Sequence, residues 1–294
     1  MVITDLLEKN ARLYASEVAL VEINPSEERD NAVTWRDLNL IENANPDAPY
    51  RREMSWRDFD RRANRFANLL LSRGLKRGTK VAILMMNCLE WLPIYFGILK
   101  AGCIAVPMNF RYSSDEIKYC LELADAEVLV FGPEFISRMD PIADSLTGLK
   151  FCFFVGKNGP AYTEDCMRLT NFCSSSVPPV ALEESDHAAI YFSSGTTGFP
   201  KAILHDHKSL LSSCFTEQNH HGHGEQDQPP RVFAISAEEA HHLAPGGKSR
   251  TNHRACAGDS GAHAVFHFSR PPPLFCWEGY AKSPAGLARQ GLEM

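Results

Sequence analysis

The sequence has no excess of basic residues, no long apolar run and no paired-cysteine motif, and each absence excludes a class of protein. Its 294 residues carry a formal net charge of -6, with a pI near 6.0, whereas nucleic acids and anionic membranes favour a basic face. No apolar run approaches the roughly 18 to 20 residues that span a bilayer. We therefore expect no nucleic-acid partner and no membrane span.

The cysteine pattern and the first residues both favour a cytoplasmic protein. Nine cysteines, an odd number without any C-x-x-C pair, indicate reduced thiols rather than a disulfide framework. Cys103, Cys120 and Cys152 lie within apolar runs, so we expect them in the core. The first nine residues include Asp5 and Glu8 and lack the basic stretch and long apolar stretch of a signal peptide.

Between residues 55 and 192 the apolar residues alternate between helical and strand spacing. Ser55 can cap a helix that ends at Gly74, a second helix is predicted over residues 89–99, and Ser113 or Ser114 can cap a third. Strands are predicted between and after these helices, at residues 81–85, 104–108, 127–131, 151–155 and 188–192. The alternation predicts an α/β fold in which helices cover a mostly parallel sheet.

A turn rich in glycine and hydroxyl groups follows the last predicted strand. It reads Ser193-Ser194-Gly195-Thr196-Thr197-Gly198-Phe199-Pro200-Lys201. Glycines let backbone N–H groups approach phosphate oxygens, hydroxyls add donors and the lysine adds a positive charge. Folds of this class bind ligands at the carboxyl ends of their strands, which is where this turn lies. It therefore predicts a polyphosphate site.

Three other interpretations of the turn can be compared with a polyphosphate site of this kind. A Walker A loop requires G-x-x-x-x-G-K-[ST], whereas Gly195, Gly198 and Lys201 fall three residues apart and Ala202 follows the lysine. Phosphoryl transfer to a hydroxyl is disfavoured, because no acidic base lies in a recognisable catalytic loop. A flexible polar connector is the remaining alternative to a phosphate site.

Three segments together resemble the adenylate-forming superfamily, which includes the acyl-CoA synthetases. The turn resembles the superfamily signature, residues 99–112 resemble its second core motif, and residues 78–84 with Asn87, Glu90 and Trp91 resemble the segment before it. The order and separation of these segments also fit, over about residues 50 to 215. The resemblance implies the front part of the large N-terminal α/β domain of that superfamily.

The resemblance implies a two-step reaction. A carboxylate attacks the α-phosphorus of ATP to give an acyl-adenylate and pyrophosphate, and a thiol, usually coenzyme A, then displaces AMP. ATP and Mg²⁺ would be the cofactors, with coenzyme A and a small-molecule carboxylic acid as the other substrates. By resemblance the β- and γ-phosphates would be held by Ser193, Ser194, Gly195, Thr196, Thr197, Gly198 and Lys201. Two positions depart from the pattern, since Phe192-Ser193 stands where Thr-Ser is commoner and Ala202 replaces a frequent glycine.

The sequence changes character beyond about Asn219, where Ile, Leu and Val become sparse and histidines crowd among Gly- and Pro-containing stretches. We therefore divide the chain into a partial AMP-binding domain, residues 1–218, and an irregular tail, residues 219–294. Disorder explains this composition, and so does a reading frame that departs from the ancestral one near Gly222. A metal site is a third interpretation, formed by His220, His221 and His223 with His241 and His242.

The resemblance also implies elements that the chain does not show, so that no catalytic residue is identifiable. These are a segment contacting adenine and magnesium, an aspartate for the ribose hydroxyls, and a lysine that contacts the reacting carboxylate. Because the phosphate turn alone supplies no charge stabilisation at the attacking oxygen, we expect little or no adenylation by this polypeptide. A non-catalytic nucleotide- or pyrophosphate-binding remnant is the alternative.

Two consequences follow from the missing elements. The residues that would line the acid pocket are not recognisable, so fatty, aryl and short-chain acids remain open as substrates. Part of a large domain would also expose strand edges and apolar faces, which predicts self-association.

Overall fold

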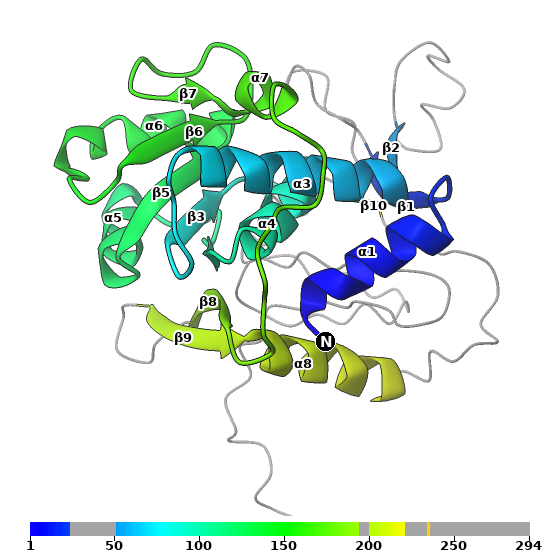
Figure 1. The fold of residues 1–294 in the computed structure, drawn as a ribbon. Helices are drawn as coiled ribbons and strands as arrows, with labels where there is room; N and C mark the ends of the chain where they lie inside the picture. Colours follow the sequence, from blue (N-terminus) through cyan, green and yellow to red (C-terminus); the bar gives the residue numbers. More distant parts are fainter. Residues whose placement is uncertain (24–50, 194–199, 221–233, 236–294) are drawn as a thin grey trace, which may run out of the picture.

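A computed structural model of the chain describes residues 1–23, 51–193, 200–220 and 234–235 (Figure 1). The strands are β1 (Val18–Ile23), β2 (Arg51–Ser55), β3 (Lys80–Leu84), β4 (Ile104–Pro107), β5 (Ala126–Phe131), β6 (Phe151–Phe154), β7 (Glu164–Asp165), β8 (His187–Ser193), β9 (Lys201–Asp206) and β10 (Ala234–Ile235). The α-helices are α1 (Ile3–Leu13), α3 (Trp56–Ser72), α4 (Trp91–Lys100), α5 (Ser114–Leu123), α6 (Ile136–Met139), α7 (Cys166–Asn171) and α8 (His207–His220). Short 3-10 turns cover Pro133–Phe135 and Ala143–Ser145.

The strands form two sheets. The larger has seven strands in the order β7-β6-β5-β3-β4-β8-β9, and the smaller has three in the order β10-β1-β2. In the larger sheet every neighbouring pair from β7 to β8 is parallel, and only β9 runs antiparallel to its neighbour. The predicted mostly parallel α/β fold is therefore confirmed.

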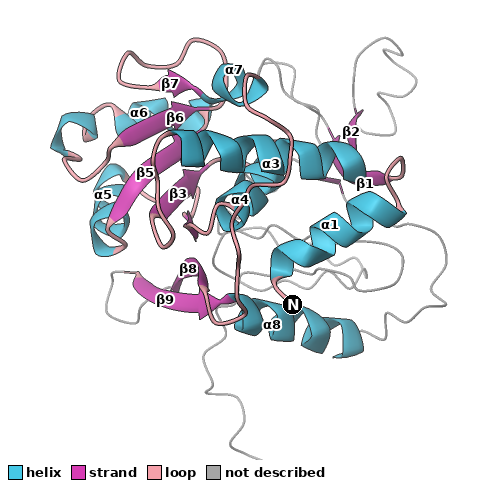
Figure 2. Cartoon of the chain, in the orientation of Figure 1, coloured by secondary structure: helices cyan, strands magenta, loops and turns pink. Residues whose placement is uncertain are grey.

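Helices cover the larger sheet (Figure 2), and alternate residues of its central strands belong to two separate cores. Val81 and Ile83 of β3 belong to the cluster that includes α1, α3, α4 and α8. Ala82 and Leu84 belong to the cluster on the α5 side. Because both faces are covered, the strands are apolar throughout, which is why the sequence shows them as short continuous apolar runs.

Local signals set the ends of the predicted helices. The Ser55 hydroxyl accepts a hydrogen bond from the Asp58 amide at 3.1 Å and so begins α3. Gly74, just beyond the helix, has a φ of 77°, a conformation that favours glycine. Ser113 caps α5, and the Glu116 carboxylate accepts a hydrogen bond from the Ser113 amide at 2.8 Å. The predictions for both helices are confirmed.

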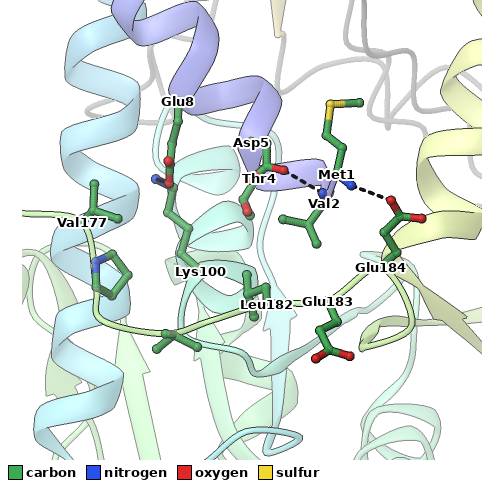
Figure 3. Close-up of a pocket in the computed structure, with 12 residues that line it drawn as sticks. Met1, Val2, Thr4, Asp5, Glu8, Lys100, Val177, Leu182, Glu183 and Glu184 are labelled. Atoms are coloured by element: carbon green, nitrogen blue, oxygen red, sulfur yellow. Dashed lines mark hydrogen bonds and ion pairs between the residues drawn. The ribbon is translucent and has the colours of Figure 1, made fainter.

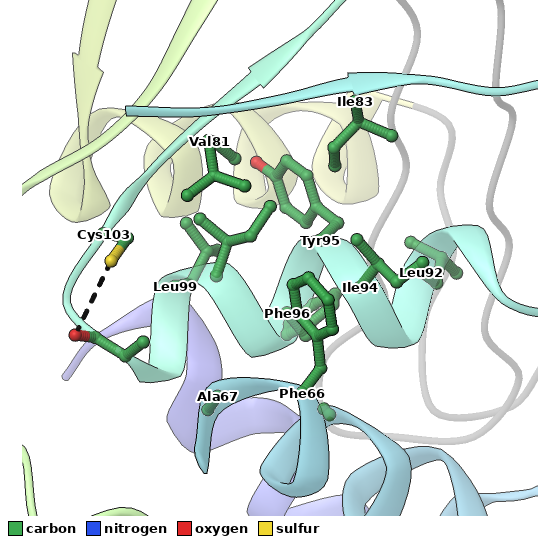
Figure 4. Close-up of a cluster of buried hydrophobic side chains, with 14 of the residues drawn as sticks. Phe66, Ala67, Val81, Ile83, Leu92, Ile94, Tyr95, Phe96, Leu99 and Cys103 are labelled. Carbon is green, nitrogen blue, oxygen red and sulfur yellow. Dashed lines mark hydrogen bonds between the residues drawn. The ribbon is translucent and has the colours of Figure 1, made fainter. Parts of the chain in front are cut away.

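Helices α3 and α4 pack closely in one core (Figure 4). Phe59 and Phe96 meet edge to face with ring centroids 5.4 Å apart. A Cβ atom built on Gly97 would lie 2.7 Å from the Ala63 carbonyl oxygen and 2.9 Å from the Phe66 Cβ. Glycine at this position therefore permits the close approach of the two helices.

Lys100, at the end of α4, is a buried cation that ties three helices together. Its side chain is 2 % exposed, and its ammonium donates to Glu8 at 2.8 Å and to Asp60 at 2.7 Å. A third hydrogen bond goes to the Asn64 side chain at 2.8 Å. Figure 3 shows Lys100 directed toward Glu8 of α1. Since every ammonium hydrogen has an acceptor, we assign Lys100 a structural role.

The predicted core cysteines are mostly buried, which agrees with their apolar surroundings. Cys103 and Cys120 are buried and Cys152 is half-buried. Burial raises the pKa of each of these three thiols to about 12. They are therefore protonated at neutral pH and suited to packing rather than to nucleophilic chemistry.

Several described elements were not predicted from the sequence. These are α1, the β1–β2 pair, the short β7 and α7, and the antiparallel strand β9. Two parts of the predicted tail are described. They are β10, which pairs in parallel with β1, and His220 at the end of α8. Residues 221–233 and 236–294 lie outside the described residues. None of the described helices combines the length and the apolar character needed to cross a bilayer.

Candidate functional site

Strands β8 and β9 anchor the two ends of the glycine-hydroxyl-lysine turn. Ser193, the last residue of β8, pairs directly with Lys201, the first residue of β9. Because β8 is parallel to β4, Ser193 lies at the edge where the carboxyl ends of the parallel strands meet. This is the edge at which open α/β sheets bind ligands.

The structure describes the two ends of the turn but not its centre. Ser194, Gly195, Thr196, Thr197 and Gly198 lie outside the described residues. Ser193 is half-buried at the end of β8, whereas Lys201 is exposed. In the described part of the chain, no carboxylate lies within ion-pair distance of Lys201. Its ammonium is thus accessible to an incoming anion.

Two tyrosines fix the strand that leads into the turn. The hydroxyls of Tyr191 in β8 and Tyr95 in α4 lie 2.6 Å apart. Burial raises the pKa of both phenols, so they are neutral hydrogen-bonding groups at physiological pH. This contact holds β8 against α4 two residues before Ser193. Sequence analysis missed it, because a tyrosine within an apolar helix has no pattern that separates it from ordinary core residues.

The polar run that follows β9 begins a helix. The Asp206 carboxylate accepts a hydrogen bond from the Ser209 amide at 2.7 Å and caps α8. His207 is 1 % exposed, and His205 packs against the Tyr191 ring with centroids 5.3 Å apart. Burial lowers the pKa of both imidazoles. Asp206 thus begins α8, and nothing in the contacts of the two histidines assigns them acid-base chemistry.

The histidine-rich metal-site interpretation falls almost entirely on undescribed residues. His221, His223, His241 and His242 lie outside the described residues. Among the side chains that the structure does describe, no group of three His, Cys, Asp or Glu residues is arranged to hold a metal ion.

Comparison with known families decides the class of the chain. The AMP-binding enzyme family matches residues 7–243. The chain belongs to the AMP-binding enzyme family. The match includes both strands that flank the turn, and it extends past the predicted domain boundary at residue 218.

Relatives within the AMP-binding family include enzymes named for different acids. The chain is 30% identical over 162 residues to the human mitochondrial acyl-coenzyme A synthetase ACSM2B, and this alignment covers 54% of this chain and 28% of that protein. It is also 30% identical over 162 residues to the long-chain-fatty-acid–CoA ligase FadD13 of Mycobacterium tuberculosis, covering 55% of this chain and 31% of that protein. The chain thus matches less than a third of the length of either relative.

A solved structure of the AMP-binding family shares the fold and holds the product of an adenylation. It is the anthranilate CoA ligase AuaEII in complex with anthranoyl-AMP, with 26% identity and a TM-score of 0.61. The alignment covers 73% of this chain and 36% of that one. The likeness therefore extends over most of this chain and a little more than a third of the known enzyme.

Proposed function

We propose that the turn from Ser193 to Lys201 binds the β- and γ-phosphates of ATP, as the front part of an acid–thiol ligase. The observation that carries the proposal is the direct pairing of Ser193 with Lys201 at the carboxyl edge of the sheet. It brings a hydroxyl and an accessible ammonium to the two ends of a glycine-rich turn. Membership of the AMP-binding family supports ATP as the phosphate compound.

The other components of the reaction follow from the same proposal. Mg²⁺ would neutralise part of the phosphate charge when bound, and coenzyme A would receive the acyl group. The relatives are named for long-chain fatty acids and for anthranilate, so the family likeness leaves the acid open among fatty, aryl and short-chain compounds. A cytoplasmic location remains part of the proposal.

Substitution of the turn lysine tests phosphate binding. We expect Lys201→Ala to weaken the binding of pyrophosphate and of Mg·ATP by about tenfold, because it removes a charge-assisted hydrogen bond worth roughly 1.5 kcal/mol or more. Isothermal titration calorimetry measures both affinities. Lys118→Ala is the matched control, since Lys118 lies on α5 in a loose ion pair with Glu122 at 3.9 Å. Equal affinities for the wild type and Lys201→Ala would remove the turn from the site.

We further propose that this polypeptide alone has little or no adenylation activity. A site that holds only the phosphate end lacks stabilisation at the α-phosphorus and at the attacking carboxylate. Exchange of labelled pyrophosphate into ATP, measured with a panel of fatty, aryl and short-chain acids, should stay at background. Acid-dependent exchange that Lys201→Ala abolishes would show instead that the chain is a working ligase.

A non-catalytic pyrophosphate- or nucleotide-binding remnant is the second candidate. The exposed edge strand β9 favours it, because Ile203 is 44% and Leu204 48% exposed where the sheet ends among the described residues. Acid-dependent exchange activity would exclude the remnant, whereas pyrophosphate binding without exchange agrees with both candidates. The same apolar edge supports self-association of the chain, with a second copy as the partner.

We also propose that the tail, residues 219–294, arises from a shift of reading frame near Gly222. The proposal depends on the change in composition and on the missing superfamily elements. Translation of the other two frames downstream of codon 222 should restore an aspartate for the ribose hydroxyls and the carboxylate-contacting lysine. If neither frame contains them, the tail is a feature of the protein itself.

A further inference from the structure

A groove lined by arginines lies away from the phosphate turn. Helix α3, the start of α4 and helix α7 enclose a cavity of about 490 Å³, and Figure 1 shows α7 beside α3. Arg61, Arg62 and Arg65 of α3 line it together with the carboxylates of Asp58 and Glu90. The groove shares no residue with the turn from Ser193 to Lys201.

Each of the two carboxylates of the groove already has a hydrogen-bond or ion-pair partner. Glu90 accepts from Arg52 at 3.0 Å and lies 3.7 Å from Arg62. Asp58 accepts from the Ser55 hydroxyl at 2.8 Å, where it helps to begin α3. Within the described ranges, no carboxylate lies within ion-pair distance of Arg61 or Arg65. Neither of these two guanidinium groups therefore has a direct ion-pair partner there.

Arg65 is the more constrained of these two groups. One of its terminal nitrogens donates to the Asn171 side chain at 3.5 Å, the limit of a hydrogen bond. Its Nε atom is buried and has no hydrogen-bond acceptor in the described part of the chain. Burying a charged donor without an acceptor is costly, and Arg61 and Arg65 also repel each other because they are four residues apart on one helix. An anion in the groove would offset the repulsion between Arg61 and Arg65.

Apolar side chains form the other wall of the groove. Phe66 and Ile94 are 1% and 4% exposed, and they line the cavity with Pro93 and Met167. Cavities of this volume with convergent polar groups beside an apolar wall are typical of small-molecule sites. The lining thus suits a ligand with an anionic end and an apolar body.

We propose that this groove binds an organic phosphate monoester with an apolar body. Guanidinium groups bind phosphate through two parallel hydrogen bonds. A phosphate monoester carries nearly two negative charges at neutral pH, which matches the two guanidinium groups without a direct ion-pair partner, whereas a carboxylate would neutralise only one. The apolar body would contact Phe66 and Ile94.

Binding of 1-naphthyl phosphate to the full 294-residue chain tests the proposal. We expect saturable binding in calorimetry that weakens as salt rises, and at least a tenfold loss of affinity in the double variant Arg61→Gln/Arg65→Gln. Arg57→Gln is the matched control, because Arg57 is exposed on the same helix outside the groove. The single variant Arg61→Gln changes an exposed residue, so it should also weaken binding while the chain stays folded by circular dichroism.

Comparison ligands and the turn variant distinguish binding in this groove from binding at the turn and from purely apolar binding. Binding should persist in Lys201→Ala, should be absent for 1-naphthol, and should be weaker for 1-naphthoate. Loss of binding in Lys201→Ala would place the probe at the turn and overturn the proposal. Equal binding of 1-naphthol would overturn the need for an anion, and equal binding of 1-naphthoate would overturn the assignment to phosphate. Unchanged affinity in the double arginine variant would remove the groove altogether.

Discussion

At the scale of single residues, Gly97 sets the distance between α3 and α4. We expect Gly97→Ala to destabilise the fold by about 1 to 3 kcal/mol, because the new methyl group would clash with the Ala63 carbonyl oxygen at 2.7 Å. In an open helix the same change would be stabilising. Urea denaturation measures the difference in the free energy of unfolding. Gly148→Ala is the control, since its Cβ would approach no atom closer than 3.9 Å, and a comparable loss there would contradict a clash at Gly97 as the cause.

His207 gives the stability of the fold a pH dependence of known sign. Burial lowers its pKa in the folded chain, with Arg77 acting in the same direction and with Asp186, Asp5 and Asp206 opposing. The unfolded chain therefore binds the proton more readily. Stability from this group is present above the unfolded pKa of about 6.5 and is lost as pH falls below it.

Urea denaturation midpoints of the wild type and of His207→Gln, at pH 7.5 and pH 5.5, test this sign. The wild type should lose stability between the two values, and the variant should lose less. Buried Glu22 acts in the opposite direction, because burial raises its pKa to about 7 and its stabilisation is lost as pH rises from about 4.5 to 7. Since both chains contain Glu22, its effect cancels in the comparison. Parallel pH dependences would exclude His207 as the cause.

Residue chemistry singled out Ser193 and Lys201 as candidates, because glycines, hydroxyls and a lysine in one turn favour phosphate binding, and their role stays a prediction. It did not reveal the contact that supports the turn. The contact between Tyr95 and Tyr191 joins residues 96 positions apart. No local pattern in a single sequence marks such a pair.

At the scale of secondary structure, the strands and helices of the central parallel sheet were predicted, whereas α1 was missed despite its buried apolar face and β9 was missed for lack of one. Helix α3 has a cap, an apolar stripe and a terminal glycine, and its predicted limits agree with the structure. Strand β9 was missed because Lys201, Ala202, Ile203 and Leu204 are all exposed. A strand without a buried face has no alternation of apolar and polar residues to recognise.

The exposed face of β9 leads to a prediction about association. We expect the double variant Ile203→Thr/Leu204→Thr to reduce self-association in sedimentation velocity, because threonine keeps the β propensity and removes apolar surface. Stability should change by less than about 1 kcal/mol, since both side chains are exposed. Phe172→Thr is the control, because Phe172 is 83% exposed away from this edge. An equal reduction in both variants would implicate exposed apolar surface in general rather than β9.

At the scale of the whole molecule, the AMP-binding family matches residues 7–243, and the fold with its mostly parallel sheet is shared with the solved structure of AuaEII. The sequence predicted the βα alternation because each strand is buried on both faces. It could not predict that β1, β2 and β10 form a separate sheet, since these strands are distant in sequence and short. The acid specificity was equally out of reach, because the chain matches only 28% of the length of a relative such as ACSM2B.

The pairing of Ser193 with Lys201 has a thermodynamic consequence for ligand binding. Directly opposed residues in an antiparallel pair lie about 5 Å apart, so the seven intervening residues form a loop whose ends are already joined. The loss of conformational entropy on closing that loop is therefore part of the free energy of folding of the sheet, and not part of the free energy of binding a nucleotide. If the turn binds phosphate as proposed, a substitution that weakens the β8–β9 pairing would transfer this cost to binding and would lower phosphate affinity without changing any residue of the turn.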